Sequence, residues 1–192
     1  MNTLVLDVVV FVCGAVVMIL ELAGSRILAP YVGTSIVVWT SLIGVVLGSL
    51  SLGYWWGGKI ADRGPSCRTF SMILFWAGVS ICLATVVKTG VLEVVQGLIR
   101  DLHVGAVVAT VMLFALPSTL LGMVSPYAVK LRMRDLGHSG RTVGVLYAIS
   151  TLGSICGTFL AGFVLIAYFG STSILLVLSG TLAALSLCAS TQ

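Results

Sequence analysis

Charged residues are scarce in this 192-residue chain. Ten Lys and Arg and six Asp and Glu make up 8% of the sequence, while 59% of the residues are hydrophobic. The mean hydropathy is +1.18. A typical soluble domain has about 25% charged residues, so a water-soluble globular domain is excluded as the main part of the chain. Nor do we expect a nucleic-acid partner.

The sequence also lacks the residue patterns of common catalytic and metal sites. It has no Gly-rich phosphate loop, no metal-ligand spacing and no paired nucleophile and base, and His103 and His138 are isolated. The five cysteines are scattered, and four of them lie in apolar runs where they pack as small hydrophobic residues. We therefore expect neither an enzyme nor a bound metal or cofactor.

Long apolar runs are the dominant feature that the chain does have. A helix needs about 20 apolar residues to cross the hydrocarbon core of a membrane. The runs predict an all-α membrane protein, a single domain over 1–192 with six transmembrane helices. Their expected ranges are 4–29, 36–58, 69–87, 104–129, 141–168 and 172–190.

The basic residues predict how the chain is oriented. Seven of the ten fall in the connections after the second and fourth helices: Lys59, Arg63, Arg68, Lys130, Arg132, Arg134 and Arg141. Basic connections remain in the cytoplasm. We expect a plasma (inner) membrane protein, surrounded by lipid, with both termini cytoplasmic. The segment Met1 to Asp7 has no basic residue and no cleavage pattern, so we expect the first helix to be retained.

The stretch from Lys88 to His103 mixes an apolar stripe with charged residues. Such a pattern is typical of a helix lying flat in the membrane interface, here on the outer side. The alternative is that the stretch simply extends the fourth helix.

The two halves of the sequence resemble each other. A shift of 100 residues aligns Gly44, Gly53 and Gly57 with Gly144, Gly153 and Gly157, and a shift of 96 aligns the Pro-Tyr pairs at 30–31 and 126–127. Two three-helix units, about 1–100 and 101–192, would enter the membrane from opposite faces, as in the inverted repeats of secondary transporters. Chance recurrence of packing glycines is the alternative.

Glycines spaced four apart predict close helix packing. The pairs place small residues on one helix face, where a neighbouring backbone can approach. The residues concerned are Gly44, Gly48, Gly53, Gly57, Gly153 and Gly157. Pro117, in the middle of the fourth helix, is expected to loosen one turn because it lacks a backbone donor.

Glu21 is the main candidate for a functional side chain. It follows Asp7 by 14 residues, about 21 Å along a helix, which places a carboxylate in the outer half of the hydrocarbon layer. Such a group is a candidate cation or proton site, and a structural pair with Arg26 or with a neighbouring helix is the alternative. The further candidates for substrate or proton binding are Arg26, Tyr31, Trp39 and Tyr127, although aromatic residues at helix ends are often interfacial anchors.

Several segments resemble the membrane region of the fused transporter-like spermidine synthases. They are 21–33 (ELAGSRILAPYVG), 39–44 (WTSLIG), 51–54 (SLGY), 57–63 (GGKIADR), 140–147 (GRTVGVLY) and 151–157 (TLGSICG). These segments lie in the first, second and fifth expected helices and in the connection after the second, and we expect the resemblance to extend over all six. It implies the membrane part of such a protein without the soluble aminopropyltransferase domain, and a fold like one half of a major facilitator.

The segment 58–63 (GKIADR) also resembles the cytoplasmic loop motif of the major facilitators, in which an acid and a base gate the cavity. Asp62 and Arg63 are the matching residues. Pro65, Ser66 and Cys67 depart from the motif, so a loop that only sets topology is the alternative.

These observations predict a homodimeric secondary transporter for a small cationic metabolite such as a polyamine. Two copies of a six-helix half would complete a facilitator, and an intramembrane carboxylate suits a cation. The alternative is a scaffold or anchor that recruits a separate aminopropyltransferase without transporting anything.

Overall fold

The computed structural model describes residues 2–33, 35–133 and 139–191, and its regular structure is entirely helical over these residues. The helices are α1 (Thr3–Val32), α2 (Ile36–Asp62), α3 (Cys67–Leu98), α4 (Leu102–Thr110), η1 (Val111–Ala115), α5 (Leu116–Arg132), α6 (Ser139–Leu160), η3 (Ala161–Leu165), α7 (Ile166–Tyr168) and α8 (Ser171–Ser190). Since η1 and η3 continue their neighbours, the described residues form six long apolar helices able to cross a membrane. The chain is a multi-pass membrane protein.

The expected positions of the six helices are confirmed, but the third helix is longer than its apolar run. Residues 88–98 are the last turns of α3, so this stretch is neither a separate interfacial helix nor an extension of the fourth. Leu92 and Val95 are buried there against the bundle, and these contacts hold the helix together beyond Lys88. The break comes later, where the Asp101 side chain accepts a hydrogen bond from Val104 N–H at 3.0 Å and caps α4.

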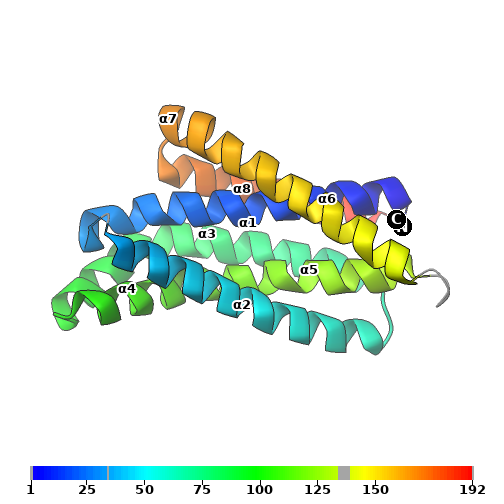
Figure 1. Cartoon of the computed structure of the whole chain (residues 1–192), viewed down its shortest axis with the longest axis horizontal. Coiled ribbons are helices and arrows are strands. Elements are labelled where there is room, and N and C mark those ends of the chain that lie inside the picture. The colour runs from blue at the N-terminus through cyan, green and yellow to red at the C-terminus, as the bar shows by residue number, and fades with distance from the viewer. Residues whose placement is uncertain (1, 34, 134–138, 192) are drawn as a thin grey trace.

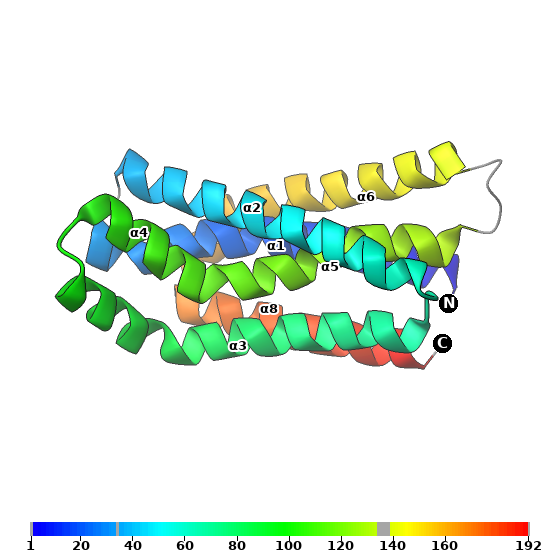
Figure 2. The same cartoon turned by 90° about the horizontal axis from the view of Figure 1, so that it is seen from below.

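The bundle has three layers (Figures 1 and 2). In Figure 2, α2 and α6 form one outer layer, α1 and α4–α5 the middle, and α3 and α8 the other outer layer. Both termini lie at one end, which we call the termini end. We call the opposite end, where α1 meets α2 and α3 meets α4, the distal end. Many large apolar side chains on the outside are exposed, which suits a surface that faces hydrocarbon.

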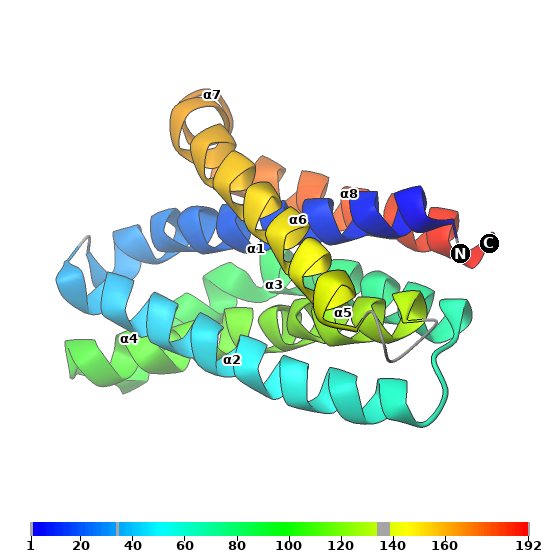
Figure 3. The same ribbon diagram turned by 45° about the vertical axis from the view of Figure 1, so that its right-hand side comes forward.

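Helices α1 and α6 cross in the upper part of Figure 3, and their backbones are in contact at glycine. A Cβ atom added to Gly157 would lie 2.6 Å from the Cα of Ala15, and one added to Gly153 would overlap the Phe11 carbonyl oxygen. The Ser154 hydroxyl donates to the Gly14 carbonyl at 3.1 Å. Only glycine at these positions allows the two backbones to touch.

The crossing of α2 and α5 has the same construction. A Cβ atom added to Gly57 would lie 2.7 Å from the Cα of Met123, and one added to Gly53 would overlap the Thr119 carbonyl oxygen. On the other side of the contact, a Cβ atom at Gly122 would lie 2.7 Å from the Leu50 carbonyl oxygen. Two helix pairs are therefore held together by backbone contact at glycine.

The contacts of the two crossings correspond position by position. Residues of α2 and α6 in matching contacts differ by 100 in number, as in Gly53 and Gly153, and those of α1 and α5 differ by 108, as in Phe11 and Thr119. This spacing differs from the 96 that aligns the Pro-Tyr pairs. The matched contacts are Gly153–Phe11 with Gly53–Thr119, Gly157–Ala15 with Gly57–Met123, and Gly14–Ser150 with Gly122–Leu50.

Two exposed glycines on α2 behave differently from those at the crossings. A Cβ atom added to Gly44 or Gly48 would meet no neighbouring atom within 4 Å. Within this chain these two residues therefore do not serve as packing positions, because they lie on the outward side of α2.

The turn before Pro117 is π-helical. Residues Val111–Ala115 form a π turn directly ahead of α5, whose second residue is Pro117. A proline ring has no N–H and displaces the carbonyl one turn earlier, so the hydrogen bonding shifts by one residue. The loosening expected at Pro117 takes this form.

The glycine contacts predict which substitutions destabilise the bundle. We expect Gly53→Ala and Gly153→Ala to lower the thermal midpoint in detergent, with a cost of about 1–3 kcal/mol each because the added methyl group forces the backbones apart. Gly180→Ala on α8 is the matched control, since a Cβ there meets nothing within 4 Å. Equal midpoints for the three variants would contradict backbone contact at the crossings.

Candidate functional site

Glu21 lies on α1, half-buried within the apolar span. Among the described residues it has no ion pair and no hydrogen-bond partner, and Arg26 does not pair with it. The two residues are five apart, which places them about 140° apart around the helix. The structural pair considered for Glu21 is therefore not formed, and its carboxylate is available to another group.

Arg26 and Tyr31 lie further along α1, at the distal end, where they line a cavity of about 280 Å³. The ends of α1 and α3 and the start of α8 border this space, which is open to the outside and which we call the Arg26 cavity. The other residues that line it are Ile27, Pro30, Lys88, Thr89, Leu92, Ser171 and Thr172. Two cationic and four hydroxyl-bearing residues thus line one cavity that no acid lines.

A second cavity of about 270 Å³ lies beside the first and shares Tyr31 and Leu92 with it. Gln96 and Arg100 line this second cavity together with Asp101, and the Gln96 amide donates to the Tyr31 carbonyl at 3.5 Å. The hydrogen bond from Val104 N–H to the Asp101 carboxylate lowers the pKa of that carboxyl.

Tyr127 is a structural residue at the other end of the bundle. It is fully buried, its hydroxyl accepts from Ser66 N–H at 2.9 Å, and its ring stacks on Phe70 with centroids 5.8 Å apart. It ties α5 to the start of α3. The structure thus separates Tyr127 from Arg26 and Tyr31, and a single site containing all the expected side chains is not formed.

Trp39 lies near the beginning of α2, with 39% of its surface exposed. It lines neither of the two distal cavities. Its position on the outside of the bundle is typical of an aromatic anchor at a membrane interface.

Asp62 and Arg63 lie at the termini end, where α2 finishes. The Asp62 carboxylate forms an ion pair with Lys130, near the end of α5, and both side chains are largely exposed. Arg63 is exposed and forms no ion pair with any described residue. The pair links the ends of two helices that already cross at Gly53 and Gly57.

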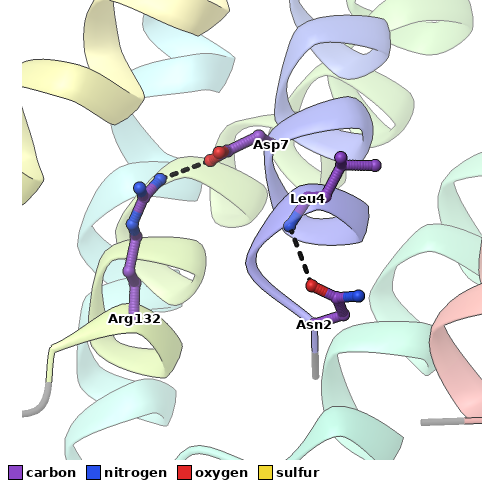
Figure 4. A network of polar contacts seen from close by, with 4 residues as sticks. All are labelled: Asn2, Leu4, Asp7 and Arg132. Carbon is purple, nitrogen blue, oxygen red and sulfur yellow. Dashed lines mark hydrogen bonds and ion pairs between the residues drawn. The ribbon is translucent and has the colours of Figure 1, made fainter.

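A second ion pair at this end joins Asp7 of α1 to Arg132 of α5 (Figure 4). The side chains of this pair are 29% and 24% exposed, so it is more buried than the Asp62–Lys130 pair. In the same view, the Asn2 side chain accepts from Leu4 N–H at 3.3 Å and caps α1. The last turn of α5 is thus bonded to both α1 and α2.

The sequence pattern does not predict the contacts of several residues in these sites. Lys88 and Thr172 are 84 positions apart, and nothing in the pattern predicts that the Lys88 ammonium donates to the Thr172 hydroxyl. The basic residues after the fourth expected helix predict only the topology, whereas in the structure Lys130 and Arg132 also form ion pairs. Arg134, from the same connection, lies outside the described residues.

The fold and these sites define a six-span helical membrane protein. Comparison with protein families, with curated proteins and with solved structures found no match.

The two ion pairs at the termini end predict unequal costs of neutralisation. Asp7→Asn should lower stability by on the order of 1 kcal/mol, because it leaves the half-buried Arg132 without its partner. Asp62→Asn should cost less than about 0.5 kcal/mol, because solvent screens the exposed pair with Lys130. Thermal unfolding in detergent measures both.

A double variant separates the ion pair from other effects of Asp7. With Arg132→Gln added, the loss should be smaller than the sum of the two single losses. A larger loss from Asp62→Asn than from Asp7→Asn would contradict the ranking by burial.

Proposed function

We propose that this protein is a homodimeric secondary transporter for a small cationic metabolite such as a polyamine. The observation that carries the proposal is the Glu21 carboxylate, half-buried in an apolar membrane span and without a partner among the described residues. On insertion scales, a charged side chain near the centre of a membrane helix raises the free energy of insertion by about 2.5–3.5 kcal/mol. A cationic substrate or a coupling proton would offset that cost.

The proposed architecture is an inverted repeat of two three-helix units. The matched crossings support it: α1 and α6 run parallel from the termini end, while α2 and α5 run parallel toward it, so equivalent pairs point in opposite directions. A shift of 108 also relates α3 to α8, because it takes Ser71 to Ser179 and Gly78 to Ser186. The contact of Ser179 with Gly78 and that of Ser186 with Ser71 are therefore equivalent to each other. Transporters built in this way alternate between two states by rocking about a fixed site.

The outer layer of α2 and α6 is the proposed contact between two protomers. Gly44 and Gly48 on α2 and Gly144 on α6 lie on this layer with open space beside them. Small residues on a lipid-facing helix allow a second helix to approach closely. The pairing would bring together two six-helix units, in the way that the halves of a major facilitator combine.

The termini end is the proposed cytoplasmic side and the location of a gate. The basic residues that favour this orientation include Arg63 and Arg68, both exposed there. The Asp62–Lys130 ion pair links α2 to α5, and its exposure makes it weak enough to break during a transport cycle. In this proposal Asp62 and Arg63 act as the gating pair, as the resemblance to the facilitator loop implies.

The substrate class rests on the resemblance to the fused spermidine synthases. An aminopropyltransferase consumes and produces polyamines, and a membrane unit associated with that chemistry would move them. A carboxylate is the side chain best suited to a protonated amine.

A non-transporting scaffold for a separate aminopropyltransferase is the second candidate. Three exposed basic residues at the termini end favour it, because a soluble acidic protein could bind to such side chains: Lys59, Arg63 and Arg68.

Transport by purified protein in liposomes tests the leading proposal. We expect radiolabelled spermidine to accumulate, and Glu21→Gln to reduce the rate to that of protein-free liposomes while the thermal midpoint stays within a few degrees. Glu93→Gln is the control, since Glu93 is exposed on the last turns of α3. Its transport rate should equal that of the wild type.

Two results would count against this proposal in different ways. A Glu21→Gln protein with normal transport and unchanged pH dependence would remove Glu21 from the site. A wild-type protein that transports no polyamine, yet retains a separate aminopropyltransferase on membranes, would favour the scaffold.

The dimer contact predicts a specific effect of bulk on the α2 and α6 layer. In mild detergent the wild type should be a dimer by light scattering, and Gly48→Leu or Gly144→Leu should raise its dissociation constant at least tenfold by separating the helices. Gly180→Leu, at an open position on α8, should leave the dimer intact. A wild-type monomer that transports would refute the proposed assembly.

A further inference from the structure

The Arg26 cavity at the distal end brings two cationic side chains together. The Arg26 guanidinium, which has five donors, is exposed and has no hydrogen-bond or ion-pair partner among the described residues. The Lys88 ammonium donates to the Thr172 hydroxyl, which leaves two of its three protons free. The two positive charges share one cavity of about 280 Å³.

No acidic residue of the described chain forms an ion pair with Arg26 or Lys88. None of the nine residues that line the cavity is acidic. Glu21 on α1 and Glu93 on α3 are the acids nearest in sequence to Arg26 and Lys88, and neither lines the space. The cavity therefore has a positive potential that favours an anion and disfavours a polyamine.

Further donors lie on the third side of the cavity. Ser171 and Thr172 are the first two residues of α8, a 20-residue helix whose N-cap, Gly170, has no side chain to accept from the first turn. The N–H groups of a first helical turn and its partial positive charge bind phosphate oxygens well. This end of α8 adds to the two cationic side chains, which would define an anion site without it.

We propose that the Arg26 cavity binds a phosphate group. Arg26 and Lys88 would form charge-assisted hydrogen bonds to its oxygens, and the hydroxyls of Thr89, Ser171 and Thr172 would complete the shell. Ile27, Pro30 and Leu92 provide an apolar wall beside the polar groups. This wall suits the glycerol and upper acyl region of an anionic phospholipid, while a free phosphate ion would use the polar part alone.

The proposal does not rest on transport or on Glu21. The phosphate site is at the end of the span, where lipid headgroups lie, and its residues come from α1, α3 and α8. Its failure and the failure of polyamine transport are separate results.

Ligand binding to purified protein in detergent tests the site. We expect dioctanoyl phosphatidylglycerol to raise the thermal midpoint in a saturable manner, and zwitterionic dioctanoyl phosphatidylcholine to require at least tenfold higher concentration. The double variant Arg26→Gln/Lys88→Gln should bind phosphatidylglycerol at least tenfold more weakly, since basic side chains near the membrane surface attract anionic lipid. Arg100→Gln, at the same end but outside this cavity, should bind like the wild type.

A second measurement uses the wild-type protein alone. Saturating phosphatidylglycerol should protect Lys88 from an amine-reactive reagent, as measured by mass spectrometry, while Lys59 on α2 remains reactive. This result tests the site even if the double variant does not fold.

Inorganic phosphate in place of lipid distinguishes the two sources of the phosphate group. Protection of Lys88 by phosphate would identify a soluble anion as the ligand, and protection by lipid alone would identify a headgroup. If neither ligand protects Lys88, or if the folded double variant binds phosphatidylglycerol as tightly as the wild type, the site is refuted.

Discussion

The contact of helix backbones at glycine is the constraint on which the rest of this structure depends. Inside a membrane, apolar side chains gain little by leaving lipid for protein, so helices associate through close packing and interhelical hydrogen bonds. Gly153 and Gly157 on α6, and Gly53 and Gly57 on α2, allow this packing against α1 and α5. In the remaining layer, two serine hydroxyls of α8 donate interhelical hydrogen bonds to backbone carbonyls of α3.

Most of the charged groups discussed above lie at the two ends of the bundle, outside its apolar core. The ion pairs of Asp7 with Arg132 and of Asp62 with Lys130 lie at the termini end, and the cationic Arg26 cavity lies at the distal end. Glu21 is the exception, because it lies within an apolar span and has no partner among the described residues. The proposed transport function and the proposed phosphate site therefore concern different depths and opposite charges.

The resemblance between the two halves acquires a physical meaning from the packing. Two of the three glycine pairs matched at a shift of 100 lie in equivalent contacts, and the pair of Gly44 and Gly144 does not. The Pro-Tyr match at 96 differs from the shift of 108 that relates the contacts of α1 and α5. Tyr31 borders the distal cavities, and Tyr127 is buried at the opposite end. Glycines that touch a backbone leave a more reliable trace in the sequence than aromatic residues near helix ends.

The sequence by itself determined the number of membrane spans, their approximate positions and four of the six glycines at the two crossings. These properties follow from local composition, because a helix must be apolar over its whole length to cross a membrane and needs small residues where another backbone touches it. Only the tertiary structure decided that Glu21 and Arg26 do not pair, that Gly44 and Gly48 face outward, and that Lys88 and Thr172 share a cavity with Arg26. Those outcomes depend on the rotation of each helix about its axis and on which helices become neighbours, and such long-range packing leaves no pattern in any single segment of the chain.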